Sequence, residues 1–239
     1  MIKKLVQANR KIVTSYLNFT NRIFGSIDDY EDFFRDKISK LSLQNKVVLE
    51  LGGANRPIFS KGRCFKYIGL DLDNSFNWEY IYDEYINDSA ESDQNINADI
   101  IISAYLFEHI RNNKKALLNI KKWLNKDGFS IHIFPLKYHP YSIINQIIGN
   151  KLGKKLIPIL RPGSESVTGY PAYYNLCSSF GLESFLTKNN FKFKVKYFYG
   201  AEDYFAFFFL FGIVINIYNR ICKVLNIKLL ASNVVLILE

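Results

Sequence analysis

The spacing of apolar positions along the chain predicts a series of helices. Apolar residues of segment 2–24 recur on one side of a helix, which predicts an amphipathic helix there. Segment 29–41 opens with acidic residues and closes with basic ones, as the helix dipole prefers. Prolines between residues 135 and 174 predict broken helices and loops. Further helices are predicted over residues 108–124, 175–187 and 203–226.

Short apolar runs rich in β-branched residues predict strands between these helices. The clearest run, residues 46–51, leads into Gly52 and Gly53, and Pro57 then suits the first turn of a helix. Alternation of strands and helices predicts a parallel, doubly wound α/β sheet. The remaining strands are predicted over residues 65–71, 79–83, 99–103, 129–134, 191–199 and 233–239.

Charge is unevenly distributed in this chain of net charge +9. Residues 1–27 carry five basic residues and no acidic one. Between Asp127 and Glu165, every charged residue is basic. Such basic stretches favour a surface for phosphate-bearing partners or anionic lipid, although an ordinary solvated surface gives the same pattern. The longest uncharged run, 204–219, is too short to span a membrane.

Three cysteines without a CxxC spacing predict reduced thiols rather than a disulfide framework. The basic N-terminal segment has no continuous apolar region of the kind found in a signal peptide. We therefore predict a cytoplasmic protein, with peripheral contact to the inner face of the membrane as an open alternative.

A carboxylate follows the second predicted strand at a telling distance from the glycine turn. Asp71 lies 20 residues after Leu51, where a carboxylate can accept hydrogen bonds from both hydroxyls of a ribose. Glycines in the turn let a ligand approach the backbone closely. An Asp that only caps a turn gives the same local pattern, so the glycine turn and Asp71 together carry the prediction.

Five motifs occur in order along the chain: LELGGA at 49–54, GLD at 69–71, ADIIIS at 98–103, LFEH at 106–109 and WLNKDG at 123–128. In this order of motifs the chain resembles class I S-adenosylmethionine-dependent methyltransferases of the small-molecule type over roughly residues 45–135. The later segments 169–174, 204–205 and 230–236 more loosely resemble methyltransferases of bacterial surface-polysaccharide gene clusters.

The resemblance implies a Rossmann-like, seven-stranded, mostly parallel sheet with helices on both faces and an antiparallel last strand. We predict one methyltransferase domain over residues 1–239. Its parts are N-terminal helices (1–44), a cofactor-binding core (45–135), a helical acceptor-side insertion or lid (136–175) and the C-terminal part of the sheet with an apolar helix (176–239).

The resemblance also implies a site for S-adenosyl-L-methionine. Glu50 would order the glycine turn near the methionyl amino group, Asp71 would hold the ribose, and Asp83 would meet the adenine amine after strand three. Leu72 would pack on the adenine. The full predicted set is Glu50, Gly52, Gly53, Asn55, Asp71, Leu72, Asp83, Ser103 and Ala104.

Two departures from the family pattern change the expected site. Ala54 stands where a second glycine is usual and Arg56 where another is common, so we expect a narrower turn. Tyr105 stands where some metal-binding members carry an acid, and no metal is expected.

His109 is the candidate general base, because an unperturbed imidazole, with a pKa of about 6.5, suits proton removal from a hydroxyl near neutral pH. Glu108 would orient the loop or cap a helix, and a purely structural role for His109 stays open. Aromatic and hydroxyl groups after strand five suit a saccharide acceptor, although each could equally be core. The predicted acceptor residues are Tyr138, His139, Tyr170 and Tyr173.

These patterns favour methyl transfer to a hydroxyl of a sugar, nucleotide-sugar or lipid-linked saccharide. A catalytically inactive Rossmann-like partner-binding protein is the first alternative. A nucleic-acid methyltransferase is the second, but the segment 103–106 lacks an Asn/Asp-Pro-Pro-aromatic motif and no cysteine follows a proline. We therefore expect no nucleic-acid partner. The apolar stretch 204–218 could be buried, form a homodimer, or join the basic N-terminal helix in membrane contact.

Overall fold

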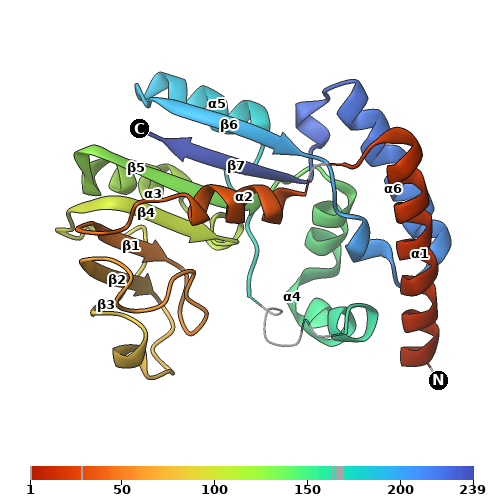
Figure 1. The fold of residues 1–239 in the computed structure, drawn as a ribbon, viewed down its shortest axis with the longest axis horizontal. Helices are drawn as coiled ribbons and strands as arrows, with labels where there is room; N and C mark the ends of the chain where they lie inside the picture. Colours follow the sequence, from red (N-terminus) through yellow and green to blue (C-terminus); the bar gives the residue numbers. More distant parts are fainter. Residues whose placement is uncertain (1, 28, 163, 165–169) are drawn as a thin grey trace. The chain divides into compact units, whose positions relative to one another are not determined.

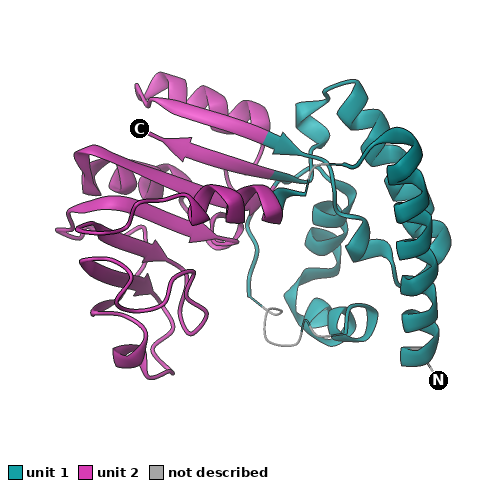
Figure 2. Cartoon of the chain, viewed as in Figure 1, with its two compact units in different colours: residues 1–30, 136–173, 197–233 teal, residues 31–135, 174–196, 234–239 magenta. Residues whose placement is uncertain are grey.

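The computed structural model describes residues 2–27, 29–162, 164 and 170–239. The chain forms two compact units (Figure 2). Unit 1 contains residues 1–30, 136–173 and 197–233, and unit 2 contains residues 31–135, 174–196 and 234–239. The assignment of residues 1–239 to one domain stays a prediction.

A seven-stranded sheet forms the centre of unit 2, with strand order β3-β2-β1-β4-β5-β7-β6 (Figure 1). Pairs β1–β2, β2–β3, β1–β4 and β4–β5 are parallel, whereas β7 runs opposite to its neighbours. This is the predicted Rossmann-like fold with an antiparallel last strand. The strands are β1 (Val47–Leu51), β2 (Lys66–Asp71), β3 (Glu84–Asn87), β4 (Ala98–Ala104), β5 (Leu124–Pro135), β6 (Phe193–Phe198) and β7 (Asn233–Leu238).

The helices predicted over residues 2–24, 29–41, 108–124, 175–187 and 203–226 are present, with some shifted ends. Around the sheet lie α2 (Tyr30–Ser39), α3 (Asn113–Trp123) and α5 (Ser179–Lys188). Unit 1 holds α1 (Ile2–Phe24), α4 (Pro140–Leu160) and α6 (Phe209–Val224). Short 3₁₀ turns are η1 (Trp78–Tyr80), η2 (Phe107–His109), η4 (Glu202–Phe205) and η5 (Lys228–Leu230).

The core of unit 2 forms where both faces of the central strands are covered. Val48 and Leu49 on β1 and Ile101 and Ile102 on β4 have no exposed surface. Residues Ala116, Leu117 and Ile120 of α3 are equally buried. These continuous apolar strands are typical of a parallel sheet enclosed between helices.

The predicted helix at Pro57 is wrong. Residues 52–65 form turns between β1 and β2. The Arg56 N–H donates to the Gly53 carbonyl at 2.8 Å, and the Ile58 N–H donates to the Glu50 side chain. The Ile58 N–H is therefore bonded to the Glu50 side chain. At the start of a helix, such an N–H would instead be free to bond to a capping side chain.

The third strand lies later than predicted. Residues Trp78–Tyr80 form η1, and β3 spans Glu84–Asn87 rather than residues 79–83. Tyr82 is fully buried, and its ring lies against Gly69, where an added Cβ would come within 2.9 Å of it. Pairing of β3 with β2 begins at Glu84, which lies opposite Ile68.

The helix predicted over residues 108–124 begins only at Asn113. Residues Phe107–His109 form η2, and the Asn112 side chain caps α3 by accepting from the Lys115 N–H at 3.1 Å. The prediction of broken helices after β5 is confirmed, because α4 contains Pro158 and a non-helical Gly149. Within the predicted insertion, residues 163 and 165–169 lie outside the described residues.

None of the helices in the described part of the chain combines the length and the apolar character needed to cross a membrane.

Candidate cofactor and catalytic site

Strand registers bring the predicted cofactor residues of unit 2 to one edge of its sheet. Leu51 at the end of β1 lies opposite Leu70 on β2 and Ser103 on β4. Asp71 on β2 lies opposite Asn87, the last residue of β3. Because these strands are parallel, the glycine turn and the ends of β2, β3 and β4 share one carboxyl edge. Open α/β sheets bind ligands at this edge.

Glu50 has a buried side chain that lies against Gly53 and holds the glycine turn through hydrogen bonds. Its oxygens accept hydrogen bonds from the Ile58 N–H at 3.1 and 3.2 Å and from the hydroxyls of Tyr67 and Tyr82. Burial raises its pKa to about 7, although these donors oppose the shift. A Cβ added at Gly53 would lie 2.5 Å from the Glu50 carboxyl carbon and from the Tyr82 hydroxyl. Only glycine therefore fits over this carboxylate.

The rest of the turn is held in left-handed backbone. Gly52 has φ +77°, and a Cβ there would lie 2.8 Å from the Leu106 side chain. Ala54 has φ +43°, so alanine occupies a conformation that glycine adopts more easily. The Tyr82 hydroxyl lies 3.2 Å from the Ala54 carbonyl and 3.4 Å from Glu50 Oε2, so these two acceptors share its one proton. Asn55 is exposed at the tip of the turn.

Asp71 ends β2 and is half-buried. Its Oδ1 accepts from the Asp73 N–H at 2.9 Å, and burial is the largest cause of its raised pKa. Leu72 is 73% exposed beside it. The Asn87 side chain donates to the Asp71 and Leu72 carbonyls at 3.1 and 3.0 Å. The end of β3 thus fixes the segment that presents Asp71 and Leu72.

Asp83 lies at the wrong end of the sheet for its predicted role. It immediately precedes β3, and its Oδ2 accepts from the N–H of Tyr67, which lies near the start of β2. The acid that follows β3 is Asp88. Its carboxylate accepts from the Ser89 N–H at 2.7 Å and from Gln94 at 2.6 Å. Asp88, rather than Asp83, is therefore the acid at the carboxyl end of β3.

Ser103 and His132 form a buried pair on β4 and β5. Ser103 Oγ lies 2.8 Å from His132 Nδ1, and neither side chain is exposed. Burial lowers the His132 pKa to about 3, so this imidazole is neutral. The Phe107 ring packs against it with centroids 5.1 Å apart. Ser103 therefore faces the protein interior, whereas Ala104 after it is half-buried at the sheet edge.

Glu108 and His109 lie in η2, just beyond the end of β4. Glu108 is fully buried and burial raises its pKa to about 8, so its carboxyl is protonated at neutral pH. Its Oε2 has no hydrogen-bond partner among the described residues. His109 Nε2 lies 3.8 Å from Glu108 Oε1, and the imidazole is partly exposed. An accessible imidazole and an unsatisfied carboxyl oxygen thus stand side by side.

The predicted acceptor residues belong to unit 1. Tyr138 is 40% exposed, Tyr170 is 54% exposed and Tyr173 is half-buried. His139 is buried and caps α4, because its Nδ1 accepts from the Tyr141 N–H and its Nε2 lies 3.0 Å from Asn219 Oδ1. These bonds occupy both ring nitrogens and favour a structural role for His139.

No group of three or more His, Cys, Asp or Glu side chains is arranged to hold a metal within the described residues. Tyr105, which replaces an acid of metal-binding relatives, instead donates from its hydroxyl to Glu31 Oε1 at 2.8 Å.

Several residues of this site were not predicted from the sequence. Tyr67, Gly69 and Asp71 alternate along β2 and so share one face, which was the available signal that Tyr67 lies near the site. No pattern pointed to Tyr82, whose ring folds back from an irregular segment. Asp88 was hidden by the misplaced third strand.

The chain is similar in sequence to one protein family and in fold to several solved structures. A family model described as a methyltransferase domain matches residues 27–192. Among solved structures, a protein from Listeria monocytogenes assigned as an S-adenosylmethionine-dependent methyltransferase is 13% identical with TM-score 0.51, over 87% of this chain and 97% of that one. Phosphoethanolamine N-methyltransferase 2 of Haemonchus contortus is 14% identical with TM-score 0.50, over 95% of this chain and 56% of that one. These low identities show the fold alone. No curated protein matches the chain.

Proposed function

This chain belongs to the methyltransferase-domain family, and we propose that it transfers a methyl group from S-adenosyl-L-methionine to a hydroxyl of a small-molecule acceptor. The observation that carries the proposal is the carboxyl edge of the unit 2 sheet. There the Glu50-anchored glycine turn ends β1 beside Asp71 at the end of β2. This is the arrangement that holds a ribose beside close-approaching backbone.

The residues at this edge suit the cofactor chemically. Asp71 would accept the ribose hydroxyls, and the exposed Leu72 would pack on the adenine. Asp88, after β3, would accept from the adenine amine. The methionyl group would lie over the glycine turn. Glu50 would act there through the backbone it orders, because its own oxygens are already bonded within the protein.

The cofactor, when bound, supplies an electrophilic methyl carbon whose sulfur leaves as a neutral thioether. The acceptor oxygen forms the new bond to carbon and must lose its proton. His109 would take that proton, because its imidazole is accessible and lies at the same edge. Glu108, protonated near neutral pH, would donate a hydrogen bond that orients the acceptor or His109. Positioning of the two reactants supplies most of the rate enhancement.

For the acceptor, we propose a sugar, a nucleotide-sugar or a lipid-linked saccharide. Support comes from the motif resemblance of the later segments and from the exposed aromatic hydroxyls of Tyr138 and Tyr170. Such side chains combine a flat apolar surface with a hydrogen-bonding end, which matches the two kinds of surface on a sugar ring.

The test is transfer of labelled methyl to a panel of nucleotide-sugars and lipid-linked glycans by the wild type and by His109→Ala. We expect at least one labelled glycan product. The variant should lose about 10²–10⁴-fold in turnover while it binds the cofactor as the wild type does. Full activity of His109→Ala would remove His109 as the base, and labelling of nucleic acid alone would contradict the acceptor class.

A further inference from the structure

Helices α1 and α6 of unit 1 pack side by side and run parallel (Figure 1). At the start of α6, the Phe209 N–H donates at 3.3 Å to Oδ1 of Asn9, which lies about two turns into α1. Further along, Gly212 lies so close to Val13 that an added Cβ would come within 2.7 Å of it. Near their ends, Arg220 donates to Asn21 Oδ1 at 2.7 Å. These contacts hold α6 against α1 from Asn9 to Asn21.

The outer side of α6 is entirely apolar. Every residue of this helix that is classed as exposed has an aliphatic or aromatic side chain, and Val224 reaches 84% exposure. A helix on a protein surface normally turns charged and polar groups to water. The exposed residues are Leu210, Phe211, Val214, Ile217, Ile221 and Val224.

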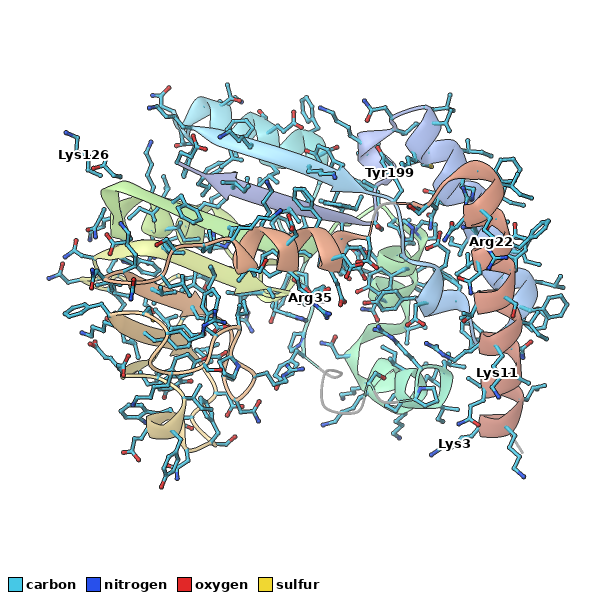
Figure 3. All side chains as sticks on the ribbon, viewed as in Figure 1. Lys3, Lys11, Arg22, Arg35, Lys126 and Tyr199 are labelled. Atoms are coloured by element: carbon cyan, nitrogen blue, oxygen red, sulfur yellow. The ribbon has the colours of Figure 1, made fainter. Side chains whose placement is uncertain are left out.

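Helix α1 carries three side-by-side columns of residues. Val6, Val13 and Thr20 are buried. One position earlier, and so about 100° around the helix, Leu5, Ile12 and Phe19 form an exposed apolar stripe, which Ile23 extends by one turn. Beyond that stripe, the exposed bases Lys4, Lys11 and Arg22 follow the helix (Figure 3 labels Lys11 and Arg22).

The apolar stripes of the two helices lie on the same side of the pair. Arg10 on α1 pairs with Asp203, and Asn216 and Asn219 on α6 donate to Glu202 at 3.1 Å each. The turn η4 therefore lies against both helices on one side. The exposed apolar residues of each helix lie on the sides away from η4 and form one surface, which we call the α1/α6 face.

We propose that the α1/α6 face binds the surface of an anionic lipid bilayer. The apolar residues would enter the boundary between headgroups and acyl chains, and Lys4, Lys11 and Arg22 along the edge would meet the lipid phosphates. Charge decides against a second copy as the occupant. A symmetric dimer through this face would bring together two basic segments 1–27, neither of which contains an acid to neutralise the other.

This surface differs from the stretch predicted from the sequence. Of residues 204–218, Phe205 and Ala206 are buried in the protein and cannot enter a membrane. The apolar surface continues instead along α6 to Val224 and Leu225. The proposal is independent of methyl transfer, because it depends only on residues of α1 and α6.

The test is co-sedimentation of the full chain with vesicles of equal parts phosphatidylcholine and phosphatidylglycerol, and with phosphatidylcholine alone. The wild type should bind the anionic vesicles at least about tenfold more strongly than the neutral ones. Val214→Ser with Ile217→Ser and Ile221→Ser should lower binding to anionic vesicles at least about tenfold. Phe180→Ser with Leu118→Ser, which changes exposed apolar residues of unit 2, should bind as the wild type does.

A charge comparison completes the test. Lys4→Gln with Lys11→Gln and Arg22→Gln should lose about tenfold or more in binding to anionic vesicles. Lys114→Gln with Lys122→Gln and Lys188→Gln removes as many exposed charges from unit 2 and should bind as the wild type does. All variants should titrate with S-adenosylmethionine like the wild type, which separates this test from the proposed function. The proposal would be overturned if the wild type bound neither kind of vesicle, or if the α1 and α6 variants bound anionic vesicles as well as their unit 2 controls did. It would also be overturned if the wild type formed a dimer that the serine variant abolished and bound no vesicles.

Discussion

Two buried carboxyl groups of unit 2, those of Glu50 and Glu108, differ in how many of their oxygens accept hydrogen bonds. Glu50 accepts hydrogen bonds from a backbone N–H and from two tyrosine hydroxyls, so it is part of the framework of the glycine turn. Glu108 leaves Oε2 without a partner within the described residues. A buried polar atom left unsatisfied costs free energy. We therefore infer that Glu108 is kept for a ligand rather than for folding.

Burial of Glu108 makes stability depend on pH. Its pKa rises from 4.5 to about 8 on folding, so the folded state holds the proton more tightly and loses stability as the pH rises through that interval. The free energy of unfolding of the wild type should therefore fall as the pH rises, and in Glu108→Gln this fall should be smaller by roughly 2–5 kcal/mol. Urea unfolding of both proteins at about pH 5 and about pH 8 measures it. An identical pH dependence in the two proteins would show that Glu108 is not the titrating group. Glu50, with a pKa of about 7, adds a loss of the same sign in both.

Asp88 and Asp83 give a matched pair of variants at the two ends of β3. Asp88→Asn should weaken S-adenosylmethionine binding by about 1–3 kcal/mol, because it removes the charged acceptor proposed for the adenine amine. Asp83→Asn should leave binding unchanged and lower stability, since Asp83 accepts from the Tyr67 N–H and lies 3.6 Å from Lys61. Calorimetric titration of both variants measures the difference. The reverse order of affinities would restore the original assignment of Asp83.

Single site residues could be predicted from the sequence where they lie at a regular distance along the chain from a clear strand or turn. Asp71 could be placed because it ends an unmistakable strand at the expected distance from the glycine turn. Asp88 could not, because β3 is a strand of only four residues that follows an irregular segment containing the buried Tyr82. The left-handed Ala54 was likewise anticipated only as a narrower turn.

Among the elements, the connection from β1 to β2 departs furthest from expectation. A helix usually follows such a turn, but here Glu50, Tyr67 and Tyr82 hold irregular backbone in place of a helix. Tight contacts between this carboxylate, the tyrosines and the turn make the element sensitive to any added atom at Gly53.

Gly53→Ala should lower the free energy of unfolding by about 1–3 kcal/mol, because its Cβ would overlap the Glu50 carboxyl group and the Tyr82 hydroxyl. Gly153→Ala in α4 is the control. Its Cβ would meet the nearest atom at an ordinary 3.5 Å, and alanine favours a helix. Denaturant unfolding of both variants measures the difference. Equal stability of Gly53→Ala and wild type would mean that Glu50 does not lie under the turn.

Long periodic elements were predictable and short ones were not. Helix α1 and the strands β1 and β4 could be predicted, because the apolar pattern that defines each of them lies within its own residues. By contrast, η1, η2 and β3 depend on contacts with distant residues, such as Tyr82 against Gly69 and the Tyr174 N–H donating to the Glu108 carbonyl. No local pattern reports such contacts.

Across the whole molecule, the candidate cofactor residues belong to unit 2 and the exposed acceptor candidates to unit 1. The sequence anticipated a core followed by an insertion, but not that residues 1–30 and 197–233 would join that insertion in one unit. Such long-range grouping arises from side-chain packing, as between Val13 and Gly212, rather than from periodicity.

The central claim is that the carboxyl edge of the unit 2 sheet binds S-adenosyl-L-methionine. Isothermal titration calorimetry of the full chain with this cofactor, for the wild type and Asp71→Ala, tests it most directly. We expect one cofactor per wild-type chain and binding weaker by about 1–3 kcal/mol in the variant. Absence of binding by the wild type at millimolar cofactor, or equal affinity of the two proteins, would contradict the claim.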